Sequence, residues 1–267
     1  TIPGIEKDVH IYGVMIAAAA ILVSHFSTKR GAAQGIPADF FNDLVFWVLV
    51  AGIVGSRLEY MRVNWSDFSG NLGASVRIWE GGLVFYGGMI AALFAFWYIC
   101  RSRKVPVLKA FDILIPYVPF GHALGRLGCF AAGCCYGAPS DASWAVTFPD
   151  EGITKSITQG LAEGVPHSVH PTQLYAAVYL ALLGVFLLWL QKRIVFPGQL
   201  LVAYLATYPI LRSINEEFRG DSERGYFMEG TFGEALSNAQ FISLVVVSIA
   251  LVFWFRLGRK AKRPSAA

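Results

Sequence analysis

The sequence predicts an all-α integral membrane protein with about seven transmembrane helices, its N-terminus outside and its C-terminus in the cytoplasm. Of its 267 residues, 55% are hydrophobic and only 15% are charged, which departs from soluble averages toward a membrane protein. Apolar runs close to the roughly 20 residues that cross a bilayer occur about seven times. Clusters of Lys and Arg follow every second run, as expected where loops alternate between the two sides of a membrane. We therefore expect a single polytopic membrane domain over residues 1–267.

The first three expected spans cover residues 11–26, 40–58 and 83–100. Acidic Glu6 and Asp8 precede the first run and further spans follow it, so we predict a retained helix here and not a signal peptide. Basic clusters follow the first and the third span, and cytoplasmic loops carry an excess of Lys and Arg. Those span ends are therefore expected in the cytoplasm. The two clusters are Lys29 and Arg30, and Arg101, Arg103, Lys104 and Lys109.

The fourth span, residues 111–130, contains Pro116 and Pro119 and is predicted to be kinked or broken. Residues 138–169 form the longest polar insertion, where Lys and Arg are scarce, and they are expected outside the cytoplasm. A basic tail follows the last span and is expected inside. The fifth, sixth and seventh spans cover residues 171–190, 198–215 and 241–257.

The net charge of +4 does not indicate a nucleic-acid-binding protein. The basic residues fall at the ends of apolar segments and form no stripe on a soluble face. We therefore expect membrane lipid, and no nucleic acid, among the partners.

Arg126 stands in the apolar, glycine-rich stretch 121–137 and is the strongest single indication of a functional site. Burying a guanidinium group in a membrane costs roughly 2.5 to 3.5 kcal/mol even on the lenient insertion scale. The glycines of the stretch recur every few residues and would let backbone or a ligand approach closely. His122 lies one helical turn before Arg126 and shares its face. We predict that this stretch forms the wall of a binding pocket.

A second charged cluster, Arg212, Glu216 and Arg219, ends the sixth span on one helical face. Glu216 could hold one arginine in a fixed rotamer while the other binds a ligand. The alternative is an Arg–Glu–Arg ladder that ties helices together. With Arg126, two arginines near the outer face would suit a phosphate group, because each guanidinium donates two parallel hydrogen bonds and keeps its charge. A phospholipid headgroup is the anion expected at that depth.

Tyr86, beside Gly87 and Gly88, opens the third span, and Tyr12 opens the first. Tyrosines also populate membrane interfaces for structural reasons, and that alternative stays open for both. His170 starts the fifth span, where it could act as a base, donate to a phosphate or begin the helix. These side chains are the candidates for proton transfer and substrate contact.

Three of the four cysteines, Cys129, Cys134 and Cys135, stand close together in the sequence, and Cys100 lies apart. They could be metal ligands, a disulfide, or small residues in a tight turn. Adjacent cysteines without a second ligand pair are weak evidence for zinc, so we expect neither a metal nor a cofactor. If the loop is external, it lies on the oxidising side, where a local bridge from Cys129 to Cys134 or Cys135 can form if the turn brings their Cα atoms within about 7 Å.

The chain resembles a known family, the bacterial prolipoprotein diacylglyceryl transferases. The resemblance comes in ordered blocks that reach nearly every expected span. The blocks are residues 10–13, 55–57, 79–88, 125–130 with 133 and 136–137, 170–175 and 212–219.

The resemblance implies a seven-helix, multi-pass enzyme of the bacterial inner membrane, expected to be a monomer. It would move the diacylglyceryl group of phosphatidylglycerol to the lipobox cysteine thiol of lipoprotein precursors and release glycerol phosphate. Two arginines fall on the family's essential positions, and proton transfer falls to a tyrosine or a histidine. The predicted catalytic residues are Arg126, Arg212, Tyr86 and His170, and the predicted substrate-binding residues are Tyr12, Arg57, Gly87, Gly88, His122, Cys129, Gly137, Glu216 and Arg219.

Three positions depart from the family pattern. The family commonly has histidine at Tyr86, asparagine at Cys129 and an acidic residue at Cys134. The missing histidine removes a simple assignment of the base and leaves room for a changed acceptor. Two other functions are open: a lipid-binding or lipid-translocating protein without catalysis, and a membrane thiol-oxidoreductase built on the cysteines.

Overall fold

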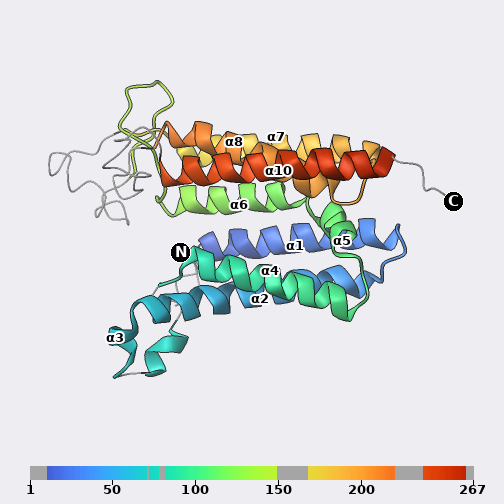
Figure 1. The fold of residues 1–267 in the computed structure, drawn as a ribbon. Helices are drawn as coiled ribbons and strands as arrows, with labels where there is room; N and C mark the ends of the chain where they lie inside the picture. Colours follow the sequence, from blue (N-terminus) through green and yellow to red (C-terminus); the bar gives the residue numbers. More distant parts are fainter. Residues whose placement is uncertain (1–10, 71, 78–81, 149–167, 220–236, 263–267) are drawn as a thin grey trace. The chain divides into compact units, whose positions relative to one another are not determined.

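The computed structural model describes residues 11–70, 72–77, 82–148, 168–219 and 237–262 (Figure 1). The chain divides into two compact units, each of which is described by itself. One comprises residues 1–22 and 114–267, and the other comprises residues 23–113.

Helices account for the regular structure of the described residues, as the sequence predicts. Two isolated bridges join Val169 to Pro139 and to Val146. The helices are α1 (Ile11–Ala32), α2 (Ala38–Val63), α3 (Trp65–Phe68), η1 (Leu72–Val76), α4 (Phe85–Ser102), α5 (Val107–Leu114), α6 (Val118–Ala131), α7 (Thr172–Leu190), η4 (Gln191–Arg193), α8 (Gln199–Glu216) and α10 (Asn238–Lys262).

Among the described residues, four helical segments are long and apolar enough to cross a membrane: α1, α2, α7 with η4, and α10. Helices α5 and α6 add a fifth if they form one broken span. The predicted break is confirmed, because the helix stops before Pro116 and a new one starts at Val118. Each predicted run overlaps a helix or this pair, but α4 and α8 fall outside the set. Seven crossings and their orientation therefore stay predictions.

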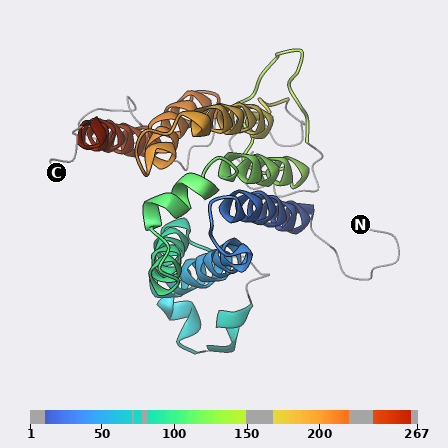
Figure 2. The ribbon, with the colours of Figure 1, turned by 90° about the vertical axis from the view of Figure 1, so that its right-hand side faces the viewer.

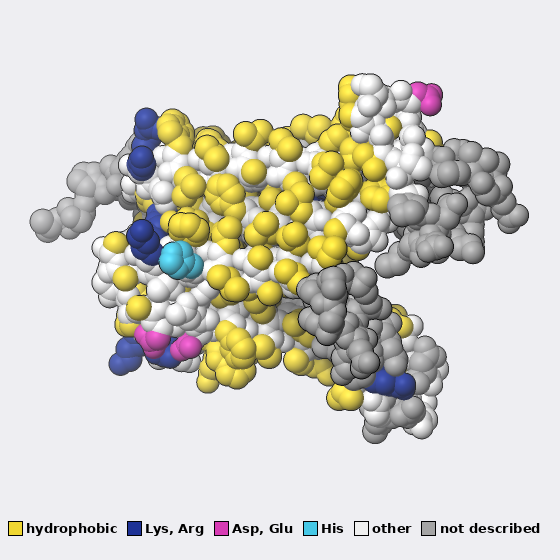
Figure 3. All heavy atoms as spheres, turned by 180° about the vertical axis from the view of Figure 1, so that it is seen from behind, with side chains coloured by type: hydrophobic (Ala, Val, Ile, Leu, Met, Phe, Trp, Pro, Cys, Tyr) yellow, Lys and Arg dark blue, Asp and Glu magenta, His cyan; other side chains and the backbone are white. Residues whose placement is uncertain are grey.

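Hydrophobic side chains cover the sides of the helices, with Lys and Arg mostly at helix ends (Figure 3). On a soluble protein such broad apolar surfaces would be exposed to water at a large cost. The same surfaces are favourable against lipid tails. This distribution supports the interpretation of the chain as a helical membrane protein.

In the unit of residues 23–113, α2 and α4 pack along each other (Figure 2). Glycines permit the close approach. A Cβ atom on Gly87 would lie 2.5 Å from the carbonyl oxygen of Gly55, and a Cβ on Gly88 would lie 2.7 Å from that of Gly52. Larger side chains at these positions would push the helices apart.

In the unit of residues 1–22 and 114–267, neighbouring helices pack in the order α6, α7, α8 and α10. The first half of α1 lies against α6, where a Cβ atom on Gly128 would be 3.2 Å from the Cβ of Met15. Ala123 of α6 packs against Ala176 and Leu180 of α7 in a small buried core. Tyr179 of α7 and Tyr208 of α8 pack against this core.

Candidate active site

Three arginines, Arg126 of α6, Arg212 of α8 and Arg219 just beyond α8, lie within electrostatic range of one tyrosine of α7. The hydroxyl group of Tyr179 interacts electrostatically with Arg126, Arg212 and Arg219. It is buried and has no hydrogen-bond partner among the described residues, and the same holds for Nε of Arg126 and for Oδ1 of Asn215. Buried polar groups are normally hydrogen-bonded, so three such atoms in one region indicate a place for a polar ligand.

Arg212 and Glu216 form an ion pair within one turn of α8, through the Nη1 and Oε2 atoms. The side chain of Glu216 is 2% exposed, and that of Arg212 is 19% exposed. The predicted pairing on one helical face is thus confirmed. The pair orients Arg212 and leaves its other donor nitrogens available for further bonds.

An aromatic group stands beside this cluster. The ring of His122 lies 5.5 Å from that of Tyr208, which stacks on Tyr204 at 5.4 Å. His122 also interacts with the charges of Arg126 and Arg212. The structure therefore brings His122 to the arginines, as its spacing from Arg126 predicts.

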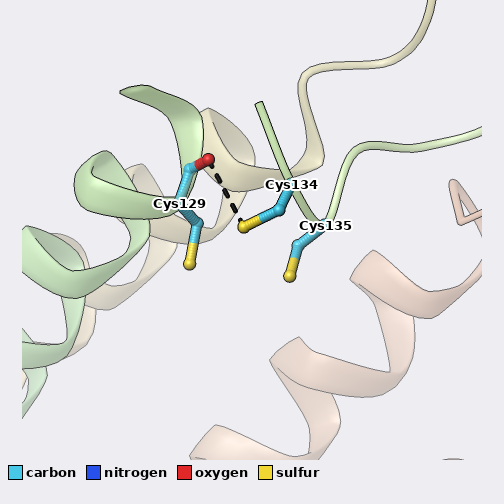
Figure 4. A group of neighbouring side chains, drawn as sticks. All are labelled: Cys129, Cys134 and Cys135. Atoms are coloured by element: carbon cyan, nitrogen blue, oxygen red, sulfur yellow. Dashed lines mark hydrogen bonds between the residues drawn. The ribbon is translucent and has the colours of Figure 1, made fainter. Parts of the chain in front are cut away.

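Cys129 lies in the last turn of α6, and Cys134 and Cys135 lie in the turn that follows it, with the three Sγ atoms all within 4.8 Å of one another (Figure 4). The thiol of Cys134 donates to the carbonyl oxygen of Cys129 at 3.6 Å. All three are free thiols, so the local disulfide, one of the alternatives left open by the sequence, is not formed in this structure. Their proximity follows from their positions along the chain, whereas a bridge also needs a specific side-chain geometry and an oxidant.

The cysteine turn has an unusual backbone that is held by α7. Both Gly133 and Cys135 have positive φ angles, 64° and 62°. For a residue with a side chain this conformation costs roughly 1 to 2 kcal/mol. Thr172 Oγ1 donates to the carbonyl of Cys135 at 2.8 Å, and Gln173 Nε2 donates to that of Cys134 at 2.7 Å. Side chains from the first turn of α7 therefore stabilise the strained turn.

Charge also gathers at this turn. The neighbouring thiols of Cys129 and Cys134, together with the charges of Arg126 and Arg219, hold the pKa of the Cys135 thiol below its ordinary value. Tyr12 of α1 interacts with the same cysteines and with Arg126. Tyr12 and Cys129 thus lie in the predicted site, next to its arginine.

A cavity of about 390 Å³ opens beside Tyr179. His170 Nδ1 lies 3.1 Å from the hydroxyl oxygen of Tyr175, which accepts a hydrogen bond of 2.7 Å from Trp144 Nε1. The cavity is mostly aromatic and aliphatic, which suits an apolar part of a substrate. Its lining comprises Trp144, His170, Tyr175, Tyr179, Leu211, Ile214, Asn215 and Phe218.

Gly137 holds the chain segments of this region together. Its N–H donates to the carbonyl of His170 at 2.8 Å, and the N–H of Ala138 donates to that of Phe218 at 2.9 Å. A Cβ atom on Gly137 would lie 2.7 Å from His170 Cβ and 2.8 Å from Thr172 Cγ2. Gly137 is therefore a position of close backbone approach, and its predicted contact with substrate stays a prediction.

We expect Gly137→Ala to lower the thermal stability of the detergent-solubilised protein, because overpacking at a rigid backbone contact costs about 1 to 3 kcal/mol. Gly13→Ala is the matched control, since a Cβ atom there meets nothing within 4 Å. The measurement is the unfolding temperature of each variant. Equal unfolding temperatures for Gly137→Ala and the unmodified chain would contradict the packing role.

Four predicted site residues lie in the other unit. Arg57 is 7% exposed and donates to backbone carbonyls of the connector after α2: Nε to Ser75 at 2.9 Å and Nη1 to Gly82 at 3.1 Å. Gly87 and Gly88 lie where α4 packs on α2, and Tyr86 is 55% exposed at the start of α4. These contacts favour structural roles for Arg57 and the glycines, and their binding of substrate stays a prediction.

The structure adds Tyr179, Asn215 and Tyr208 to the site, and sequence reasoning missed all three. None is charged, so none stands out in an apolar run as Arg126 does. A usable signal was present in the tyrosine pairs at one-turn spacing, Tyr175 with Tyr179 and Tyr204 with Tyr208.

Comparison with known proteins adds an independent observation. A family model described as prolipoprotein diacylglyceryl transferase matches residues 2–256. The chain belongs to this family. Relatives named phosphatidylglycerol–prolipoprotein diacylglyceryl transferase occur in Methylococcus capsulatus, with 36% identity over 91% of this chain and 90% of the relative, and in Finegoldia magna, with 32% identity over 92% and 90%. A relative of the same name in Clostridium tetani is 30% identical over 94% of both chains.

Membership of the prolipoprotein diacylglyceryl transferase family makes the chain an enzyme of the transferase class and a multi-pass membrane protein. The resemblance seen in the sequence is thereby confirmed. The roles of single residues are a separate matter, which the family match by itself leaves as predictions.

Proposed function

We propose that this chain transfers the diacylglyceryl group of phosphatidylglycerol to the lipobox cysteine thiol of prolipoproteins, forming a thioether and releasing glycerol phosphate. The observation that carries the proposal is the group of Arg126, Arg212 and Arg219 around Tyr179, with unpartnered buried polar atoms among the described residues. Cations inside apolar helices suit an anionic headgroup. The neighbouring 390 Å³ cavity suits an apolar part of the lipid or of the precursor.

In the proposed reaction, the sulfur of the precursor cysteine attacks the glyceryl carbon that bears the phosphate ester. A carbon–sulfur bond forms and the carbon–oxygen bond to phosphate breaks, so negative charge grows on the departing glycerol phosphate. Arg126 and Arg212 stabilise that charge through bidentate hydrogen bonds, and fixed donors of this kind are usually the main source of rate acceleration. Glu216 orients Arg212, and Arg219 adds to the positive field around the headgroup.

The thiol proton must also leave during the attack. A free thiol has a pKa of about 8.5, so a few per cent of it is ionised at neutral pH and a strong base is helpful without being essential. We assign proton transfer to His170, His122 or Tyr86. Of these, His170 already has a hydrogen-bond partner that borders the cavity, the hydroxyl of Tyr175.

The proposal includes seven crossings of the bacterial inner membrane by a monomer, with the N-terminus and residues 138–169 outside and the C-terminal tail inside. The distribution of Lys and Arg supports this orientation. It would place the Cys129 to Cys135 turn, and the arginine of α6, toward the outer side, where lipoprotein precursors are exposed.

We expect a cysteine introduced at Ser143, which is exposed, to be labelled by a membrane-impermeant maleimide in intact cells. A cysteine introduced at exposed Lys192, beyond the end of α7, is the matched reporter for the inner side. It should be labelled only after the inner membrane is breached. Cells with the unmodified chain give the background from its four native cysteines. The reverse labelling pattern would invert the topology.

The function itself is tested by incubating the purified protein with phosphatidylglycerol and a lipobox peptide. Mass spectrometry should detect the peptide with an added diacylglyceryl group, together with free glycerol phosphate. Binding of phosphatidylglycerol without any peptide product would favour the lipid-binding alternative. Product formation that depends on added oxidant would favour the thiol-oxidoreductase.

A further inference from the structure

We propose that Cys129, Cys134 and Cys135 form a binding site for a thiophilic divalent cation of the zinc type. The group shares Cys129 with the predicted substrate-binding residues, and its proposed role is distinct from the transfer reaction, in which we assign no step to a metal ion. The proposal departs from our expectation from the sequence, in which adjacent cysteines without a second ligand pair were weak evidence for zinc. What changes the interpretation is the arrangement of the side chains in space.

The distances fit a common ion. All three Sγ atoms lie within 4.8 Å of one another. Thiolates bound tetrahedrally to zinc at about 2.3 Å are separated by roughly 3.8 Å. The three sulfur atoms therefore need only small side-chain adjustments to reach one metal ion. Figure 4 shows the three side chains grouped at the turn, with Cys134 directed toward Cys129.

The backbone of the turn explains how adjacent cysteines converge. In extended chain, the side chains of neighbouring residues point to opposite sides. Cys135 instead has a φ angle of 62°, in the left-handed region that residues with a side chain rarely adopt. Strained backbone conformations concentrate where the surrounding structure holds a functional group in place.

Two hydrogen bonds from α7 hold the backbone of Cys134 and Cys135 in the conformation that groups the three cysteine side chains. Thr172 and Gln173, both at most 1% exposed, donate to the carbonyl oxygens of Cys135 and Cys134. The turn is thus connected to the first turn of α7 on one side and to the end of α6 on the other. A bound ion would fix these two helix ends together, and with them Arg126, which lies one turn before Cys129.

Charge and stoichiometry also favour a metal over a disulfide. Arg126 and Arg219 interact with Cys135, so a negatively charged metal–thiolate group has positive charge beside it. A disulfide would use two sulfur atoms and leave the third unexplained. No further His, Cys, Asp or Glu of the described residues joins the group. The fourth position of a tetrahedral ion would be taken by water.

Binding is a displacement of protons and involves no oxidation. One divalent ion replaces up to three thiol protons and gives a trithiolate complex with one negative charge. Affinity should therefore fall as the pH is lowered, because protons compete with the ion for sulfur. Protons released into a weak buffer on mixing count the thiols that lose a proton when the ion binds.

The test uses the purified full-length protein, reduced and kept free of oxygen, with Co²⁺ as a spectroscopic probe and Zn²⁺ as competitor. We expect saturable sulfur-to-cobalt charge-transfer absorption at one ion per chain, displaced by Zn²⁺. Serine at position 129, 134 or 135 should weaken binding by more than about 100-fold, since loss of mere supporting contacts costs 10- to 100-fold. Cys100→Ser, a buried cysteine outside the group, should leave binding unchanged.

Zn²⁺ should also raise the unfolding temperature of the unmodified protein and not that of the triple serine variant. Because the unmodified chain is measured directly, a variant that fails to fold does not decide the result. Absence of charge-transfer absorption in the reduced protein would overturn the proposal. So would cobalt binding that survives in the triple serine variant, or a disulfide between two of these cysteines that persists in the presence of Zn²⁺.

Discussion

Replacing Arg126 by lysine is expected to remove nearly as much transferase activity as replacing it by alanine, in both cases about 100-fold or more, as for the loss of a fixed donor to a developing anion. Lysine keeps the charge of Arg126. It loses the planar group that donates two parallel hydrogen bonds to a phosphate, and a single ammonium group is more strongly hydrated. Nε of Arg126 is buried without a partner among the described residues. A ligand would therefore use the parallel N–H donors of the planar guanidinium group, which lysine lacks.

The measurement is product formation from phosphatidylglycerol and a lipobox peptide, per folded molecule in detergent. Arg62→Lys is the control, because Arg62 is 70% exposed and pairs with Glu59 outside the arginine group. It should retain activity. If Arg126→Lys keeps most of the transferase activity, then Arg126 acts as a point charge or a structural residue. The proposal that Arg126 binds the phosphate through two parallel hydrogen bonds would then be wrong.

Elements that depend on local composition could be predicted from the sequence. Apolar runs located the long helices, although α1 continues to Ala32 and α2 to Val63, beyond the predicted ends. Polar residues in the last turns of those helices concealed their true length. The short helices α3 and η1 were not predicted, since they depend on how the connector folds onto Arg57 and not on a periodic pattern.

The arginines of the site could be predicted for a physical reason that the tyrosines lack. A guanidinium group within an apolar helix is costly, so its presence alone indicates a partner or ligand. Tyr179 and Asn215 carry no such signal, and their importance depends on burial and on missing partners, which only coordinates reveal. For Gly87 and Gly88, close packing of α2 and α4 gives glycine a structural reason that the sequence did not reveal, while their predicted binding of substrate stays a prediction.

Replacing Glu216 by glutamine is expected to lower the transferase turnover number by about 10- to 100-fold with a small change in KM, which is typical of the loss of a group that orients a catalytic residue. Glu216 is 2% exposed and holds Arg212 through a charged hydrogen bond. Glutamine keeps an oxygen acceptor of similar shape but removes the charge. Arg212 would then lose part of its fixed orientation toward the departing phosphate.

Glu216→Ala should lower the stability of the protein as well as its turnover. Removing one partner of a buried ion pair leaves an uncompensated charge, which costs about 3 to 5 kcal/mol of stability. Glu217→Gln is the matched control, one position further along. Glu217 is exposed and accepts a hydrogen bond of 2.5 Å from Gln240 Nε2, away from the arginines. That variant should keep both stability and activity.

The decisive comparison is between turnover and unfolding temperature in the same preparations. A positioning role predicts that Glu216→Gln folds with nearly unchanged stability but turns over slowly, and that Arg212→Ala and Glu216→Gln are not additive in the double variant. The structural alternative, a ladder that ties helices together, predicts loss of stability with unchanged turnover per folded molecule. Full activity in a stable Glu216→Gln variant would show that the orientation of Arg212 is set by other contacts.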